Sequence, residues 1–112
     1  TLWHVTAAAA AAAPILDGRG SAELLRRGSL EVRWYAPKGA VRQGAHDRDE
    51  VYVVGHGSGV FMRGGERVTF GPGDLLFVPA KTEHRFEYFS ADLATWVVFY
   101  GPVGGERDGG ST

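Results

Sequence analysis

The chain has 112 residues, enough for one domain with a single core but too few for two. Its formal net charge of −1 gives no reason to expect nucleic acid or a membrane as a partner, and without cysteine any metal must be held by nitrogen and oxygen ligands. The 17 glycines and 5 prolines predict many tight turns rather than long helices.

Residues 1–20 are expected to form an N-terminal extension. The run AAAAAAAPIL at 7–16 lacks a preceding basic segment and is too short to span a bilayer, so a cytoplasmic protein is expected. Thr6 can cap a short alanine helix that Pro14 helps to end, with disorder as the alternative. The following segment, 21–27, is compatible with either a helix or a strand.

From residue 30 onward, short apolar or alternating segments are separated by turn residues such as Gly64-Gly65. Seven or eight short strands without intervening helices predict an all-β antiparallel sandwich or barrel. The barrel is expected over residues 21–103, followed by a flexible tail at 104–112. The expected strands are residues 30–35, 50–54, 60–63, 66–70, 75–79, 84–89 and 94–100.

The last expected strand is apolar on both faces, and its pattern leaves the direction of its side chains open. Either Trp96 and Val98 or Val97 and Phe99 face the core.

The segment HDRDE at 46–50 places a histidine and a glutamate four positions apart, directly before an apolar strand. On a straight strand these two side chains would lie about 13 Å apart, too far to bind one ion. A turn at 47–49 can bring them together. Alternatively, the charges form only a solvated hairpin tip, which is the more frequent role of such a pattern in isolation.

A second segment, PGDLLFVPAKTEHRF at 72–86, places a Gly-Asp turn, a strand and a proline before His84. Together the two segments resemble the cupin superfamily, in particular small single-domain bacterial cupins of the cupin-2 type. The family's two motifs are G(x)5HxH(x)3–4E(x)6G and G(x)5PxG(x)2H(x)3N, and the matching residues are His46, Glu50, Gly57, Gly73, Pro79 and His84. The resemblance covers residues 28–102 and implies a jelly-roll barrel, or double-stranded β-helix.

The sequence departs from the family motifs at three positions. Gly44 stands where the first histidine of HxH is expected, and Gln43 beside it offers an amide oxygen that reaches the pocket only through a bulge. Lys81 replaces the second-motif glycine, which suggests a turn without positive φ. Tyr88 replaces the final asparagine, which would put a phenol near the barrel interior.

The resemblance implies a divalent metal, Fe(II), Mn, Ni or Zn, held by His46, Glu50 and His84, with Gln43 as an additional candidate ligand. One expectation is a metal-dependent enzyme, dioxygenase-like or isomerase-like, acting on a small organic substrate. A second is a non-catalytic ligand-binding or sensor protein. A third is a purely structural barrel in which His84 pairs with Glu50.

Aromatic side chains share the strand faces of the expected ligands. Tyr52 lies on the face of Glu50, and Phe86 and Tyr88 lie on the face of His84. These three aromatics are expected to line a substrate pocket, with Tyr52 and Tyr88 as the candidates for catalytic proton handling. Filling the hydrophobic core is an equally good explanation for all of them.

Two cations and the strand edges suggest further partners. Arg48 and Lys81 could meet an anionic substrate at the mouth of the pocket, although solvated charge is the simpler interpretation. Small barrels with exposed edge strands often cover them with a second chain. A homodimer is therefore expected, formed through the first strands or the N-terminal segment.

Overall fold

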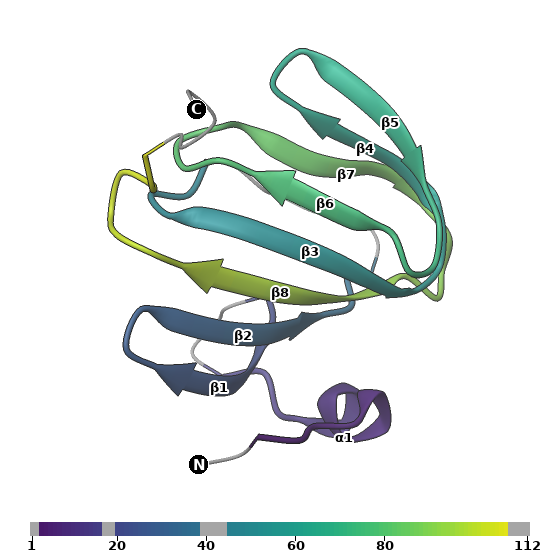
Figure 1. The fold of residues 1–112 in the computed structure, drawn as a ribbon. Coiled ribbons are helices and arrows are strands. Elements are labelled where there is room, and N and C mark those ends of the chain that lie inside the picture. The colour runs from purple at the N-terminus through teal and green to yellow at the C-terminus, as the bar shows by residue number, and fades with distance from the viewer. Residues whose placement is uncertain (1–2, 17–19, 39–44, 108–112) are drawn as a thin grey trace.

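The computed structural model describes residues 3–16, 20–38 and 45–107, and within them the chain forms two antiparallel sheets (Figure 1). One sheet has five strands in the order β1-β2-β8-β3-β6, and the other has three in the order β5-β4-β7. The strands are β1 (Ala22–Arg27), β2 (Leu30–Tyr35), β3 (Asp49–His56), β4 (Gly59–Arg63), β5 (Glu66–Phe70), β6 (Leu75–Val78), β7 (His84–Phe89) and β8 (Ala94–Tyr100). The predicted all-β fold is confirmed, and of the segment 21–27 residues 22–27 form a strand.

The alanine run forms a short helix, α1 (Ala7–Ala12), as one of the two alternatives predicted. The Thr6 side chain accepts a hydrogen bond from the Ala9 N–H at 3.1 Å, which is the expected N-cap. Ala13 is already extended, with φ −67° and ψ 142°, because the following proline disfavours a helical conformation. Across the described parts of the chain, no helix combines the length and the apolar character needed to cross a membrane.

The main core lies between the two sheets and is rich in aromatic side chains. Strand alternation directs Tyr52 and Val54 of β3 inward, where they join Phe61 of β4 and Phe86 of β7. All four are at most 3% exposed. Fully burying a side chain of this size contributes about 1.5–3 kcal/mol, so this cluster supplies much of the driving force that brings the sheets together.

Strand β8 packs against different partners on its two faces. Val97 is buried in the main core and Phe99 packs against it, so this pair faces the barrel interior. Trp96 points the other way and meets Trp34 of β2 edge-on, with ring centroids 4.8 Å apart. Both tryptophans belong to a second cluster that includes Ala10 of α1. This arrangement decides between the two orientations that the sequence left open.

Residues 104–106, expected as the start of a flexible tail, are bound to the region around the start of β3. The Gly104 N–H donates to the Asp47 carbonyl, and the Glu106 N–H donates to Asp49 Oδ2 at 2.8 Å. The Ala80 N–H donates to the other oxygen of the same carboxylate, also at 2.8 Å. The buried Asp49 side chain thus joins the C-terminal segment to the turn after β6, and ordered contacts continue past residue 103.

Two turn positions show why the motif spacing matters. Gly57, the last glycine of the first motif, has φ +90°, and a Cβ there would lie 2.6 Å from Leu93 Cα. No other residue fits this close approach without backbone movement. Lys81, in the second motif, has φ 65° in the turn that the Thr82 N–H closes by donating to the Pro79 carbonyl. The expectation that Lys81 marks a turn without positive φ is therefore wrong, because the turn keeps the left-handed backbone of the family glycine.

Lys81→Gly is expected to stabilise the fold by roughly 0.5–1 kcal/mol. A left-handed backbone costs an L-residue about 1–2 kcal/mol, more than the roughly 0.5–1 kcal/mol that glycine loses in conformational entropy. Urea denaturation followed by circular dichroism measures the difference. Lys38→Gly, at an exposed position without positive φ, should not stabilise the protein. A lower unfolding free energy for Lys81→Gly would contradict this account.

Candidate metal centre

The three sequence-predicted ligands meet between the two sheets. Glu50 is the second residue of β3 in the five-stranded sheet, and His84 is the first residue of β7 in the three-stranded sheet. His46 lies in the loop before β3, where the chain bends at residues 47–48. One candidate ligand atom from each of the three side chains lies within 4.8 Å of the other two. The bend therefore brings His46 and Glu50 together, because a straight strand would have kept them apart.

His84 is fully buried, and its ring is oriented by the backbone. Nδ1 lies 2.9 Å from the Thr82 carbonyl oxygen, so we assign the ring proton to Nδ1, which donates to that oxygen. Nε2 then presents its lone pair to the site, 3.2 Å from the Tyr52 hydroxyl. Burial lowers the pKa of His84, but the Glu50 carboxylate and the Thr82 carbonyl outweigh burial and hold this pKa above its ordinary value.

Glu50 carries a carboxylate into the interior, where its side chain is 2% exposed. Its Oε1 lies 3.1 Å from His84 Nε2, within ion-pair range, yet this oxygen accepts no hydrogen bond from the residues that the structure describes. In the neutral ring, with its proton on Nδ1, Nε2 has no hydrogen to donate; only the protonated ring, which the Glu50 carboxylate favours by raising the pKa of His84, donates from Nε2 to this oxygen. A buried polar atom left unsatisfied costs about 1–3 kcal/mol, and more when it is charged, so a cation between these groups would offset a substantial penalty.

His46 is the accessible member of the cluster, with a side chain that is 44% exposed. Its ring lies 5.2 Å from the ring of His84 and meets Phe99 edge-on at 5.3 Å between centroids. Its backbone carbonyl accepts a hydrogen bond from the Lys81 N–H. The left-handed turn of the second motif is thus bound directly to the loop that carries the first histidine, and this contact holds the two motifs together.

The separations between these atoms suit a divalent metal. Bonds of about 2.1 Å place neighbouring ligand atoms about 3.0–3.4 Å apart around an octahedral or tetrahedral ion. Glu50 Oε1 lies 3.1 Å from His84 Nε2 and 3.8 Å from His46 Nε2. Because His46 is exposed, a small rotation of its ring can complete the set. Two imidazoles and one carboxylate form a donor set that suits non-haem Fe(II) and also accepts Mn, Ni or Zn.

Two of the three aromatic residues expected near the site lie inside the barrel. Tyr52 is 1% exposed and Phe86 is 3% exposed, and their rings meet edge-on at 5.0 Å. With the ring proton on Nδ1 of His84, the Tyr52 hydroxyl donates to Nε2 of the same ring. The Tyr52 oxygen therefore lies next to any ion that this nitrogen binds.

The third aromatic residue, Tyr88, lies on the outer surface and is 70% exposed. The expectation that its phenol is near the barrel interior is wrong. The register between β4 and β7 shifts by one residue, which leaves Glu87 as the extra residue of a bulge. The bulge reverses the alternation of side chains, so that Phe89 rather than Tyr88 packs against the core.

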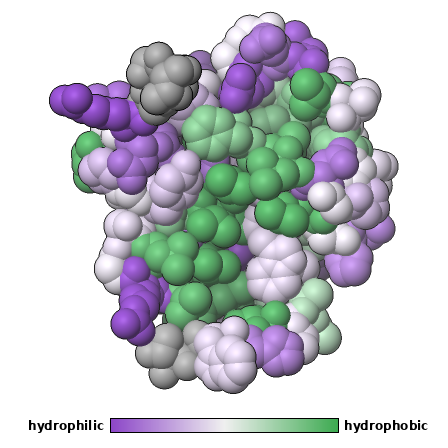
Figure 2. Space-filling model, in the orientation of Figure 1, coloured by the Kyte–Doolittle hydropathy of each residue, from purple (hydrophilic) through white to green (hydrophobic). Residues whose placement is uncertain are grey.

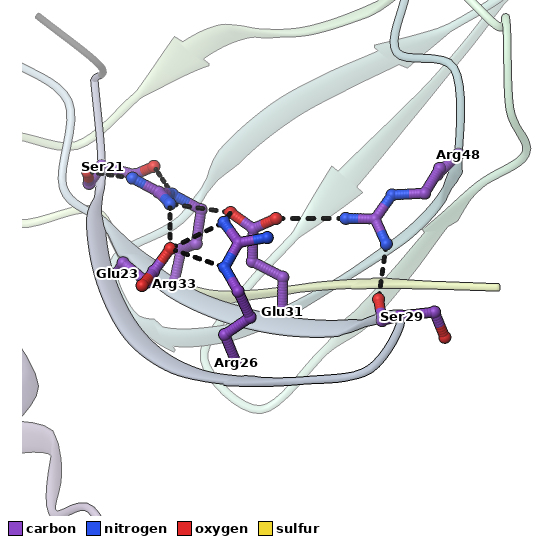
Figure 3. Close-up of polar contacts among 7 residues, drawn as sticks. All are labelled: Ser21, Glu23, Arg26, Ser29, Glu31, Arg33 and Arg48. Atoms are coloured by element: carbon purple, nitrogen blue, oxygen red, sulfur yellow. Dashed lines mark hydrogen bonds and ion pairs between the residues drawn. The ribbon is translucent and has the colours of Figure 1, made fainter. Parts of the chain in front are cut away.

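A charged network on β1, β2 and the loop before β3 was not anticipated from the sequence (Figure 3). The buried Glu31 carboxylate lies 3.3, 2.8 and 3.1 Å from guanidinium nitrogens of Arg26, Arg33 and Arg48. Arg48 also donates to the Ser29 carbonyl. Arg48 therefore pairs with Glu31 and anchors the loop two residues after His46. Its charge is not free to bind a substrate.

Tyr35 is another residue near the site that the sequence analysis did not identify. Its hydroxyl is buried and has no hydrogen-bond partner within residues 3–16, 20–38 and 45–107, and the centroid of its ring lies 6.1 Å from that of Phe86. Burial and the charge of Glu50 raise the pKa of Tyr35 to about 12, so the phenol stays protonated at neutral pH. Tyr35 lies outside both motifs, and no sequence signal marks it. Gln43, the additional ligand candidate, and Gly44 lie outside the described residues.

With this geometry established, comparison with known proteins gives a consistent result. The cupin domain family matches residues 32–100. An uncharacterized protein of Streptomyces coelicolor, SCO3923, is 34% identical over 82 residues, which cover 71% of this chain and 78% of that protein. The chain belongs to the cupin family, and the resemblance inferred from the two motifs is confirmed.

Solved structures share the fold at lower identity. A Ralstonia eutropha protein described as a candidate mannose-6-phosphate isomerase has a TM-score of 0.62 and 24% identity, over 82% of this chain and 94% of its own. A predicted oxalate decarboxylase from Thermotoga maritima has a TM-score of 0.58 and 25% identity, over 71% and 77%. A cupin 2 conserved barrel protein from Salinispora arenicola has a TM-score of 0.57 and 18% identity, over 72% and 74%.

Proposed function

We propose that this cupin binds a divalent metal ion through His46, Glu50 and His84 and uses the open coordination positions to bind a small oxygen-bearing organic ligand or substrate. The observation that carries the proposal is Glu50 Oε1, a buried carboxylate oxygen that has no hydrogen-bond donor among the described residues and lies 3.1 and 3.8 Å from two imidazole nitrogens. A bound ion would supply Lewis acidity and, if it is iron, O2 chemistry. The proposed activity is that of a metal-dependent oxidoreductase, dioxygenase or isomerase. Two structural neighbours, described as a candidate mannose-6-phosphate isomerase and a predicted oxalate decarboxylase, have names that support a small oxygen-rich substrate.

The residues around the proposed ion have distinct roles. Glu50 lowers the net charge of the centre, and His84 is held by Thr82 with Nε2 toward the ion. The Tyr52 hydroxyl, 3.2 Å from that nitrogen, is placed to contact a ligand of the ion and to donate or hold a proton. We also propose that the protein acts as a homodimer, because each sheet ends in edge strands, β1 and β6 in one and β5 and β7 in the other.

Protein purified without chelator is expected to carry one divalent ion per chain, measured by elemental analysis. Adding Fe(II), Mn(II), Ni(II) or Zn(II) to metal-free protein, at a hundredfold excess over Kd, should stabilise it by about 2.7 kcal/mol, or roughly 10 °C in Tm for a domain of this size. His84→Ala should abolish uptake while the fold survives, whereas His56→Ala, at an exposed position, should retain it. An empty site together with an unchanged Tm would end the metal proposal.

Glu50→Gln is expected to change stability in opposite directions with and without metal. In metal-free protein the neutral amide removes the cost of a buried charge. The free energy of unfolding should therefore rise by about 1 kcal/mol or more, and Tm should rise with it. With metal present, the stabilisation seen in the original protein should be lost. Glu66→Gln, which changes a carboxylate that is 82% exposed, is the matched control and should alter neither value. A metal-free variant less stable than the original protein would contradict this account of Glu50.

Tyr52→Phe is expected to keep the metal and lose ligand affinity. Removing one hydrogen bond of about 1 kcal/mol should weaken the binding of formate to the metal-loaded protein roughly fivefold, measured by isothermal titration calorimetry. Tyr88→Phe, on the outer surface, should bind formate unchanged. Equal affinities for the two variants would remove Tyr52 from the site. Stabilisation by formate without any metal would favour a non-catalytic binding protein.

A further inference from the structure

Strand β2 directs its polar side chains into the barrel and its apolar side chains outward. Glu31, Arg33 and Tyr35 share the inner face, whereas Val32 and Trp34 lie on the outer face. The outer side of the same sheet is hydrophobic, as Figure 2 shows across the middle of the molecule, where Figure 1 places β3, β6 and β8. Antiparallel strands ordinarily place apolar residues inside and polar residues outside, so the inward polar row of β2 requires an explanation.

Tyr35 is the member of this row that has no partner. Glu31 and Arg33 pair with each other at 2.8 Å, so their charges are matched (Figure 3). The Tyr35 hydroxyl is buried and makes no hydrogen bond to any residue that the structure describes. Its cross-strand neighbour Thr95 directs its own hydroxyl to the Val53 carbonyl, at 3.0 Å. The phenol therefore presents an unused donor to the interior.

An unused buried hydroxyl weakens the native state, whereas a phenylalanine ring would fill the same space without that cost. Residues that are kept at the expense of stability are typical of binding and catalytic sites. Within the described residues, the other buried side-chain atom without a partner is Glu50 Oε1. A metal ion would account for Glu50, but it leaves the Tyr35 hydroxyl without a role.

Phe86 links Tyr35 to the candidate metal centre. Its ring centroid lies 6.1 Å from that of Tyr35 and 5.0 Å from that of Tyr52, whose hydroxyl is 3.2 Å from His84 Nε2. The two phenol rings are therefore no farther apart than these two centroid distances taken together. Burial and the charge of Glu50 raise the pKa of Tyr35 to about 12, so its hydroxyl keeps its proton and can donate it in a hydrogen bond at neutral pH.

We propose that the Tyr35 hydroxyl binds the far end of the substrate, by donating a hydrogen bond to an oxygen of a molecule whose near end binds the metal ion. The middle of that molecule lies against Phe86 and is apolar. An extended chain advances about 1.2 Å per bond, so the ring distances limit the molecule to roughly nine bonds between its two oxygens. The inference rests on the proposed function and adds the substrate class, a short molecule with an oxygen acceptor at each end.

A buried water molecule that accepts the Tyr35 proton is the competing explanation. Such a water needs about two to four polar partners. The neighbours of Tyr35 in the main core include Val54, Phe86 and Val97, which are apolar, and the Thr95 hydroxyl is directed to the backbone. The two explanations predict opposite effects on stability, because removing the hydroxyl would leave a structural water without one of its partners.

The first test compares ligand binding by the metal-loaded original protein and Tyr35→Phe, measured by isothermal titration calorimetry. The probes are formate and the ω-hydroxy acids from glycolate to 6-hydroxyhexanoate, each paired with the unsubstituted acid of the same length. In the original protein, at least one hydroxy acid should bind roughly fivefold more tightly than its unsubstituted partner, as expected for one hydrogen bond. Tyr35→Phe should lose this advantage and bind formate unchanged, because formate reaches only the metal ion.

The matched control is Tyr88→Phe, which removes the same hydroxyl from a side chain that is 70% exposed. It should keep the advantage of the hydroxy acid. If no hydroxy acid of the series binds more tightly than its partner, or if the advantage survives in Tyr35→Phe, Tyr35 does not bind the substrate.

The second test is the thermal stability of metal-free Tyr35→Phe. Because the unused hydroxyl is removed, Tm should rise by about 4–8 °C, whereas Tyr88→Phe should leave it unchanged. A lower Tm, or a Tyr35→Phe protein that does not fold, would show that the hydroxyl has a structural partner and would overturn the inference.

Metal uptake separates this inference from the function on which it rests. Tyr35→Phe leaves His46, Glu50 and His84 in place and should bind the same amount of metal as the original protein. A protein that binds metal and formate but gains nothing from the hydroxyl of any acid overturns the role of Tyr35 and leaves the metal proposal standing. An original protein that takes up no metal overturns both.

Discussion

The buried carboxylate of Glu50 is the interaction on which the site depends. Its side chain enters the interior from β3, and no residue in the described part of the chain donates a hydrogen bond to Oε1, although His84 Nε2 and His46 Nε2 both lie within 4 Å. A fold formed only for stability would place an apolar residue there, since a buried charge without a partner weakens the native state. The surrounding contacts hold the two imidazoles in place instead. The Thr82 carbonyl orients the His84 ring, and a hydrogen bond from the Lys81 N–H to the His46 carbonyl fixes the loop that carries His46.

Much of the fold and of the ligand set was predictable because local patterns determine them. Alternating strands separated by glycine-rich turns indicated an all-β fold, and the structure places strand β7 at the predicted residues 84–89. The chain also bends between His46 and Glu50, as their spacing predicts, because side chains four apart on a strand can meet only if the chain bends. These inferences need only standard backbone geometry and the spacing of the motif residues, which the sequence gives.

Other features depended on contacts that the sequence does not contain. The bulge at Glu87 is a property of pairing between β4 and β7, so alternation within β7 alone assigned Tyr88 to the wrong face. Lys81 combines a left-handed backbone with a hydrogen bond from its N–H to the His46 carbonyl, a contact between residues 35 positions apart in the sequence. The pairing of Glu31 with three arginines is likewise a tertiary arrangement, and a single strand pattern could not reveal it.

The extra residue in β7 has a consequence for how such a pocket can diversify. Beyond the bulge, inside and outside are exchanged along the strand, so the pairing of β7 with β4 governs which aromatic ring borders the cavity. Inserting one residue into β4 between Val60 and Phe61 would give Glu87 a partner, restore simple alternation along β7 and carry the Tyr88 phenol inward. In this barrel, a change in strand length would place a phenol in the interior. Point substitutions on β7 would leave the direction of the Tyr88 side chain unchanged.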